Sequence, residues 1–161
     1  MATTTGTSTT GVDRLLTMYE SGTHPEYAHV TLLGLATYDA VKLHERVERG
    51  LSFHALDKLR RVLDVPTSEF AELIWVAPRT LARRKEAKRL QPDESDRLLR
   101  MSRVVGTALR LFEGRLPEAR AWLLGPHEAL GGEVPIRLAA SEIGAREVEN
   151  LIGRLEHGIP L

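Results

Sequence analysis

Apolar residues recur every three or four positions between residues 51 and 113, which is the spacing of one face of an α-helix. Within residues 52–65, Leu56, Leu59 and Leu63 share a face, and Ser52 precedes them as a candidate N-cap. No segment shows a convincing alternation of apolar and polar residues, which is the pattern of a half-buried strand. We therefore predict an all-α fold.

The same spacing divides the chain into a series of helical segments. Val65 and Pro66 end the first one, because a residue before proline avoids the helical backbone conformation. Thr67 and Ser68 are candidate caps for the next helix. The other segments with helical spacing are residues 24–50, 67–75, 79–89, 93–113, 117–124 and 145–156.

Composition separates three parts of the 161-residue chain. Residues 1–12 are almost entirely Thr, Ser, Gly and Ala, and residues 13–20 allow at most two helical turns, so we predict a flexible tail over residues 1–23. A helical domain over residues 24–113 follows. Gly and Pro become frequent from residue 114, which predicts short helices and tight turns in a second domain over residues 114–161.

Charge and cysteine content limit the partners and sites that this chain can have. It has 22 basic and 22 acidic residues, so binding to nucleic acid or to an anionic membrane requires a local patch. It has no cysteine, which excludes disulfides, thiolate metal sites and a cysteine nucleophile. We find neither a membrane-spanning stretch nor a secretory signal, so we expect a cytoplasmic protein with no membrane partner.

Residues 67–75 and 79–89 form a candidate helix–turn–helix, which is two short helices joined by a tight turn. The second helix is strongly basic, with six Lys or Arg and one Glu within residues 78–89. Such a helix binds DNA phosphates with release of counterions, and Arg can pair with guanine in the major groove. A solvated surface helix is the alternative, but the position of this helix in a helical pair favours DNA binding. The candidate DNA-binding residues are Arg79, Thr80, Arg83, Arg84, Lys85, Lys88 and Arg89.

Two sets of motifs occur in the order found in a known family. The run RTLARRKEAKRLQPDESDRLLR, residues 79–100, resembles the Xre-like half of the Xre/MbcA/ParS antitoxins. The C-terminal piece is similar to the toxin-binding domain of that family, and its marks include Trp122-Leu123, the run from Ala129 to Gly132, and the ending at residues 155–158. The resemblance covers residues 30–158.

The resemblance implies a type II antitoxin, with an Xre-like helix–turn–helix domain followed by a small helical toxin-binding domain. The implied partner is a RES-domain toxin, an enzyme that acts on NAD, whose active-site entrance the C-terminal domain covers. The resemblance also implies a homodimer that binds double-stranded DNA at its own promoter. The candidate toxin-binding residues are Trp122, Pro126, Leu130, Gly131, Gly132, Pro135, His157, Gly158, Ile159, Pro160 and Leu161.

Some of these residues have a purely structural explanation as well. Trp122 is either an interface anchor or a core residue, and the Gly131-Gly132 pair also fits a plain turn. The apolar chain end at residues 157–161 fits either a pocket of a partner or the chain's own surface. The dimer contact is expected in residues 30–50 or in the helix over residues 93–113.

Two other functions compete with the antitoxin. One is a stand-alone helix–turn–helix transcriptional regulator with a C-terminal protein-interaction domain, and the other is an adaptor that does not bind DNA. An enzyme is not expected, because the histidines lack HExxH spacing and the chain contains no GxSxG, P-loop or GxGxxG motif. We expect no cofactor and no metal.

Overall fold

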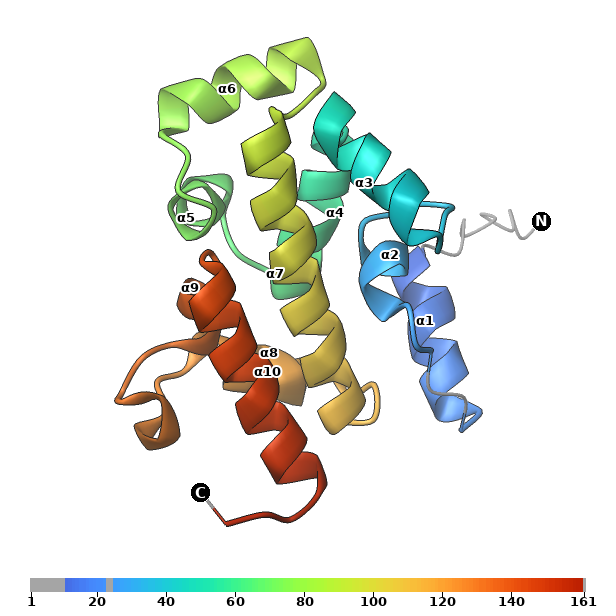
Figure 1. Cartoon of the computed structure of the whole chain (residues 1–161), viewed down its shortest axis with the longest axis vertical. Coiled ribbons are helices and arrows are strands. Elements are labelled where there is room, and N and C mark those ends of the chain that lie inside the picture. Colours follow the sequence, from blue (N-terminus) through green and yellow to red (C-terminus); the bar gives the residue numbers. More distant parts are fainter. Residues whose placement is uncertain (1–10, 23–24, 161) are drawn as a thin grey trace, which may run out of the picture.

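The computed structural model describes residues 11–22 and 25–160 and has the all-α fold that the sequence predicts (Figure 1). Within these residues the chain makes ten α-helices and one 3-10 helix, and no strand. The bounds of these elements are α1 Gly11–Glu20, α2 Ala28–Leu32, α3 Ala40–Arg49, α4 Phe53–Leu63, α5 Thr67–Leu73, α6 Pro78–Ala87, α7 Pro92–Leu111, α8 Leu116–Leu124, η1 Glu128–Leu130, α9 Pro135–Leu138 and α10 Glu142–Glu156.

Helix α7 runs through the middle of the molecule and contacts helices from both halves of the chain (Figure 1). Its apolar residues Leu98, Met101, Val105 and Leu109 follow one another at three- and four-residue spacing, and all four are buried. Helices α2 and α3 pack against α7 from the N-terminal half, and α8, α9 and α10 pack against it from the C-terminal half. Both halves therefore share one hydrophobic core that is built around α7.

A row of ion pairs joins α10 to α7. Three glutamates of α10, spaced by seven residues, face arginines of α7. The pairs are Arg100–Glu142 at 3.0 Å, Arg103–Glu149 at 2.6 Å and Arg110–Glu156 at 2.8 Å. The residue numbers rise together along both helices, so the two helices run in the same direction. Partly exposed pairs contribute little stability each, but the row specifies how α10 lies along α7.

The N-terminal segment differs from the flexible tail predicted for residues 1–23. Residues 11–20 form α1, in which Val12, Leu15, Leu16 and Tyr19 have the spacing of one helix face. Leu15 is fully buried, Tyr19 is 5% exposed, and α1 packs against α2. Burial of this apolar face stabilises a helix directly after the polar residues at the start of the chain, so α1 belongs to the core. Residues 1–10, 23 and 24 lie outside the described residues.

The N-caps agree with the prediction at one helix and differ at the next. The Ser52 hydroxyl caps α4 as predicted, because it accepts a hydrogen bond of 3.2 Å from the N–H of Ala55. Thr67 and Ser68 do not cap α5. Pro66 occupies the N-cap position of that helix, and its side chain has no hydrogen-bond acceptor.

Helix α10 begins at Glu142, earlier than the predicted start at Ala145. The Ser141 hydroxyl accepts a hydrogen bond of 3.0 Å from the N–H of Gly144 and so caps the helix. Gly144 is required at this position, because a Cβ atom there would overlap the carbonyl oxygen of Leu138. The absence of a side chain lets α9 pack directly against the first turn of α10.

Residues 28–49 contain two helices, although their apolar spacing fits one continuous pattern. The chain leaves the helical conformation after α2, and Gly34 has a left-handed φ of 68°. Helix α3 follows, and none of its residues is buried. Tyr38, just before α3, is 57% exposed, and Val41 is 67% exposed. Apolar side chains on this face of the molecule therefore remain accessible.

Candidate DNA-binding and toxin-binding surfaces

Helices α5 and α6 form the predicted helix–turn–helix, close to the predicted ranges 67–75 and 79–89. The N–H of Val76 donates a hydrogen bond of 2.9 Å to the carbonyl of Ala71 and closes the turn. Trp75 lies in the turn with a φ of 56°, which is uncommon for a residue with a bulky side chain, and is 63% exposed. Pro78 opens α6, where its missing N–H costs no hydrogen bond.

Two side chains hold α6 against the rest of the domain. Leu81 is 2% exposed and belongs to the core. Arg84, on the same side of the helix, forms an ion pair of 2.9 Å with Glu94, which is 4% exposed. The Glu94 carboxylate also accepts a hydrogen bond of 2.8 Å from the N–H of Gln91 at the start of α7. Glu94 therefore joins the first turn of α7 to the inner side of α6.

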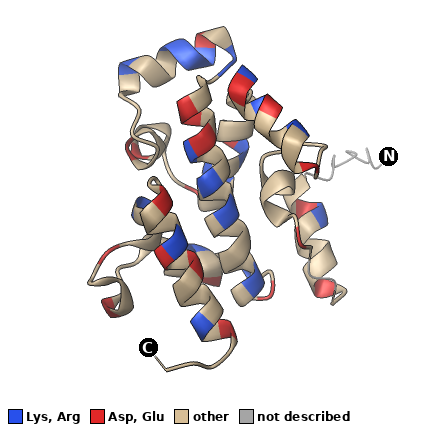
Figure 2. Ribbon diagram, in the orientation of Figure 1, with Lys and Arg blue, Asp and Glu red and all other residues tan. Residues whose placement is uncertain are grey.

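The opposite side of α6 is basic and exposed. Arg79 and Arg83 are four residues apart, share one face and lie on the side of the helix away from Leu81. Lys85 and Lys88 are also exposed. Figure 2 shows that Lys and Arg recur along α6 at one end of the molecule. This side of the helix has the charge and the accessibility that phosphate and base contacts require.

The other predicted DNA-binding residues have roles inside the chain. Thr80 is half-buried and accepts a hydrogen bond of 3.4 Å from Arg83. Arg89 donates hydrogen bonds of 3.0 and 2.9 Å to the carbonyls of Arg49 and Gly50 at the end of α3. Arg84 is paired with Glu94, as described above. The cations of the predicted set that have no such internal partner among the described residues are Arg79, Lys85 and Lys88.

In the C-terminal half, Trp122 packs inside its own domain. Its ring stacks on His127 with a centroid distance of 4.8 Å and lies 6.5 Å from the ring of Phe112. The Nε2 atom of His127 is 2.7 Å from the carbonyl oxygen of Trp122. Trp122 is partly buried and packs against the common hydrophobic core, so it exposes only part of its ring.

The remaining predicted toxin-binding residues divide into buried and exposed positions. Leu130 and Pro135 are buried and support the turn around η1. Pro126, Gly131 and Gly132 are exposed, and both glycines have a positive φ, 67° and 86°. These glycines therefore adopt the left-handed backbone conformation that the turn requires, and their exposed surface is mostly main chain.

The chain end continues past α10 as an exposed segment. His157, Gly158 and Pro160 are exposed, and Ile159 is 51% exposed. The N–H of Ile159 donates a hydrogen bond of 2.9 Å to the carbonyl of Arg154, which turns the chain at the end of the helix. Leu161 lies outside the described residues.

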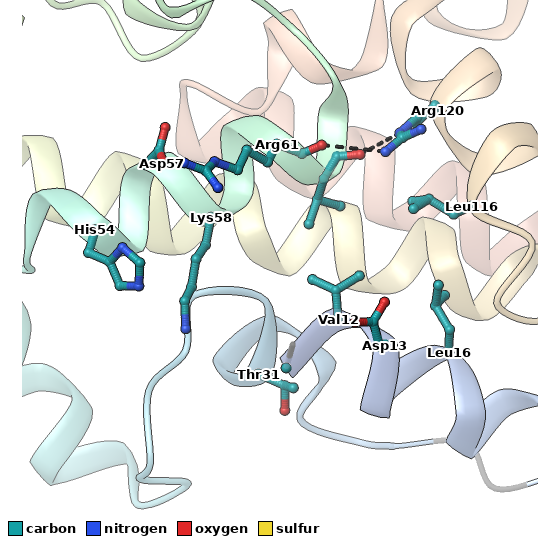
Figure 3. Close-up of a pocket in the computed structure, with 12 residues that line it drawn as sticks. Val12, Asp13, Leu16, Thr31, His54, Asp57, Lys58, Arg61, Leu116 and Arg120 are labelled. Atoms are coloured by element: carbon teal, nitrogen blue, oxygen red, sulfur yellow. Dashed lines mark hydrogen bonds and ion pairs between the residues drawn. The ribbon is translucent and has the colours of Figure 1, made fainter. Parts of the chain in front are cut away.

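A cavity of about 560 Å³ lies between α1, α4 and α8 (Figure 3). Arg120 of α8 donates hydrogen bonds to the carbonyls of Arg61 and Val62 at the end of α4. Asp57 pairs with Arg61 at 2.8 Å, and Lys58 points toward the loop that follows α2. The hydrogen bonds of Arg120 therefore connect the C-terminal half to the helix–turn–helix half. In the described ranges we find neither a cluster of three metal-ligating side chains nor a helix long and apolar enough to cross a bilayer.

Comparison with known proteins identifies the family. A family model described as the antitoxin Xre-like helix-turn-helix domain matches residues 42–103, and one described as the antitoxin Xre/MbcA/ParS C-terminal toxin-binding domain matches residues 107–158. A curated protein named Antitoxin Xre from Yersinia enterocolitica is 34% identical over 128 residues, which are 79% of this chain and 86% of that protein. This chain belongs to the Xre antitoxin family.

Two further relatives named Antitoxin Xre agree with this assignment. The protein from Photorhabdus laumondii is 31% identical over 128 residues, which are 79% of this chain and 86% of the relative. The protein from Pseudomonas putida is 30% identical over 121 residues, which are 74% of each chain. This Xre-family chain thus has a helix–turn–helix domain followed by a toxin-binding domain, and the second domain implies a toxin as partner.

Two apolar residues of α10 are exposed in this Xre-family chain: Ile143, which the sequence analysis did not single out, and Leu155, which it placed on the buried face. Ile143 in the first turn of α10 is 85% exposed, and Leu155 in its last turn is 36% exposed. The spacing of apolar residues over 145–156 predicts one buried face made of Val148, Leu151, Ile152 and Leu155. The first three are buried, but Leu155 is exposed because it lies in the last turn, beyond the surface that α10 packs on. Ile143 lies outside that face on a helical wheel, which is a signal that sequence alone provides.

Proposed function

We propose that this Xre-family chain is the antitoxin of a type II system whose toxin carries a RES domain and consumes NAD. Its C-terminal domain covers the active site of the toxin, and α6 binds an operator in the chain's own promoter and represses transcription. The RES class and the NAD chemistry rest on the family resemblance. The observation that carries the proposal is that the basic helix α6 and the apolar chain end lie at opposite ends of the molecule (Figure 1). One chain therefore has room for both partners.

The DNA-binding half is tested by fluorescence anisotropy with the DNA upstream of the gene at several salt concentrations. The variant Arg79→Ala with Arg83→Ala removes the two arginines of the outer side of α6. We expect weaker binding to the upstream DNA at every salt concentration, because the variant loses the cations on the exposed side of α6. Arg115→Ala with Arg137→Ala removes the same charge from the C-terminal half and should bind like the wild type. Unchanged binding by the α6 variant would exclude α6 as the DNA-binding helix.

The toxin-binding half is tested by co-expression with the product of the adjacent gene. We expect the full chain to restore growth and the cellular NAD level. A chain that lacks residues 157–161 should protect less while it binds DNA with unchanged affinity. Trp75→Ser is the control, because it removes an exposed apolar side chain from the other half of the molecule. Failure of the full chain to protect would leave the stand-alone regulator as the function, and full protection by the truncated chain would show that the chain end does not cover the active site.

A homodimer is part of this proposal, because helix–turn–helix proteins read paired half-sites. The sequence left the dimer contact open between residues 30–50 and the long helix. The packing favours the first, because α7 is covered by helices of its own chain, whereas α3 has no buried residue and Tyr38 and Val41 are exposed.

Sedimentation equilibrium tests the dimer contact. Val41→Glu should shift the chain from dimer to monomer, because it places a charge in an apolar interface. Ile143→Glu, at an exposed apolar residue of the C-terminal half, should leave the dimer intact. A Val41→Glu chain that dimerises like the wild type would exclude this face.

A further inference from the structure

A basic cleft of about 540 Å³ lies between α4, α6 and the start of α5. Helix α6 contributes Lys85, and Lys88 follows at its C-cap. Helix α5 contributes its first residue Thr67, and α4 contributes His54 together with a cluster of one acid and two arginines. Neither the family assignment nor the outer side of α6 accounts for this cleft, because Arg79 and Arg83 do not line it.

The cleft carries an excess of positive charge. Asp57 is the acid among its lining residues, and both of its oxygens are engaged, by Arg60 at 2.9 Å and by Arg61 at 2.8 Å. Lys85 and Lys88 have neither an ion pair nor a side-chain hydrogen bond with any other described residue. An anion that enters the cleft therefore meets two lysines without displacing an internal partner.

The position of the cleft on the helix–turn–helix places it next to the sugar-phosphate backbone of a docked DNA. Lys85 comes four residues after the buried Leu81, so it lies beside the inner side of α6, on the flank of the helix. In a docked helix–turn–helix the second helix occupies the major groove and the first helix crosses the sugar-phosphate backbone. Thr67 is the first residue of that first helix and lines the cleft. The backbone that α5 crosses consequently passes the cleft.

We infer that this cleft holds a phosphodiester group of the operator backbone, bound by Lys85 and Lys88, with the hydroxyl of Thr67 as a further donor. Arg79 and Arg83 on the outer side of α6 are then left for the base edges. Arg84 and Arg89 hold the helix in place through Glu94 and the end of α3. The inference rests on the proposed operator binding. It divides the basic residues of segment 79–89 into three roles, of which only one reads sequence.

The test compares a lysine variant with the wild type on the upstream DNA and on a scrambled duplex. The variant is Lys85→Gln with Lys88→Asn, because Lys88 has a φ of 58° and Asn tolerates this conformation better than Ala. A single neutralised phosphate contact reduces the salt slope by about 0.9, so the loss of affinity between about 50 and 200 mM salt should become about 3- to 4-fold smaller than in the wild type. The affinity for both duplexes should fall by the same factor. Circular dichroism checks that the variant is folded.

The control for charge is Arg115→Gln with Arg137→Gln, which removes two cations from the C-terminal half and should keep the wild-type slope. A second arm replaces single operator phosphates by neutral methylphosphonates. At one position on each strand the wild type should lose affinity while the lysine variant does not change, because that phosphate is the one in the cleft.

Three outcomes would overturn the inference. The salt slope of the lysine variant could equal that of the wild type, its loss of affinity could be confined to the upstream sequence, or every methylphosphonate could affect the variant and the wild type alike. In each of these cases wild-type binding to the upstream DNA would still support the proposed function. Absence of wild-type binding to that DNA would overturn both.

Discussion

The carboxylate of Glu94 connects the inner side of α6 to the start of α7, so its removal should destabilise the fold more than the removal of any nearby surface charge. Glu94→Gln keeps the size of the side chain but weakens two interactions. The hydrogen bond to the N–H of Gln91 is worth about 1 kcal/mol as a helix cap, and the charge-assisted hydrogen bonds from Arg84 are worth about 1.5–3 kcal/mol. We expect the free energy of unfolding to fall by about 2–4 kcal/mol, which lowers the midpoint of urea denaturation by about 1–2 M.

The neighbouring residue Asp93 provides the matched control. Its carboxylate pairs with Arg97 at 2.9 Å but is 67% exposed, so Asp93→Asn should cost less than about 1 kcal/mol. Adding Arg84→Met to Glu94→Gln should cost less than the sum of the two single changes, because the double variant leaves no unpaired guanidinium. If Glu94→Gln and Asp93→Asn have the same midpoint, α6 is held by packing and not by this ion pair.

Other expectations concern glycines, a half-buried histidine and a helix cap. Gly144→Ala should destabilise the protein by about 1–3 kcal/mol, because a Cβ atom there would overlap a backbone carbonyl, whereas Gly153→Ala in the same helix has free space and should stabilise it by up to about 1 kcal/mol in thermal denaturation. Burial lowers the pKa of His29 below 6.5, so its unfolded form binds a proton more readily, and the free energy of unfolding should fall as the pH drops below 6.5; His29→Gln should reduce this fall in urea titrations at pH 7.5 and 5.5. Ser52→Ala should cost about 1 kcal/mol through loss of the α4 cap, whereas Ser68→Ala should stay within about 0.5 kcal/mol, and equal losses would contradict the cap assignment.

The helices of this protein could be predicted wherever neighbouring residues alone determine them. The stripe of Leu56, Leu59 and Leu63 and the cap at Ser52 are local patterns, and both appear in the structure as predicted. Helix α1 lies in a segment predicted to be a flexible tail. A short apolar stripe next to a polar run does not predict a packed helix unless the surface that it packs on is known. The exposure of Val41 could not be predicted, since apolar spacing indicates a buried face without indicating whether the same chain covers it.

The candidate DNA-binding surface was predictable as a set but not residue by residue. The charge of residues 78–89 located the helix, because that signal is a property of a continuous segment. The ion pair between Arg84 and Glu94 forms because the start of α7 lies beside α6. A contact between two helices of this kind leaves no pattern in the residue spacing of either helix. The pairing of α10 with α7 did leave a signal, the seven-residue repeat of Glu142, Glu149 and Glu156, but its partner helix became known only from the fold.

Helix α7 and its ion pairs connect the two ends of the protein. The first turn of α7 anchors α6 and its later turns anchor α10, over a helix of 20 residues that is about 30 Å long. If the proposed function holds, one continuous helix connects the toxin-binding half to the operator-binding half, so the two partners would be held at a fixed distance and angle. The size of the bound toxin would then decide whether two toxin-bound molecules fit on adjacent half-sites, and the ratio of toxin to antitoxin would control occupancy of the proposed operator.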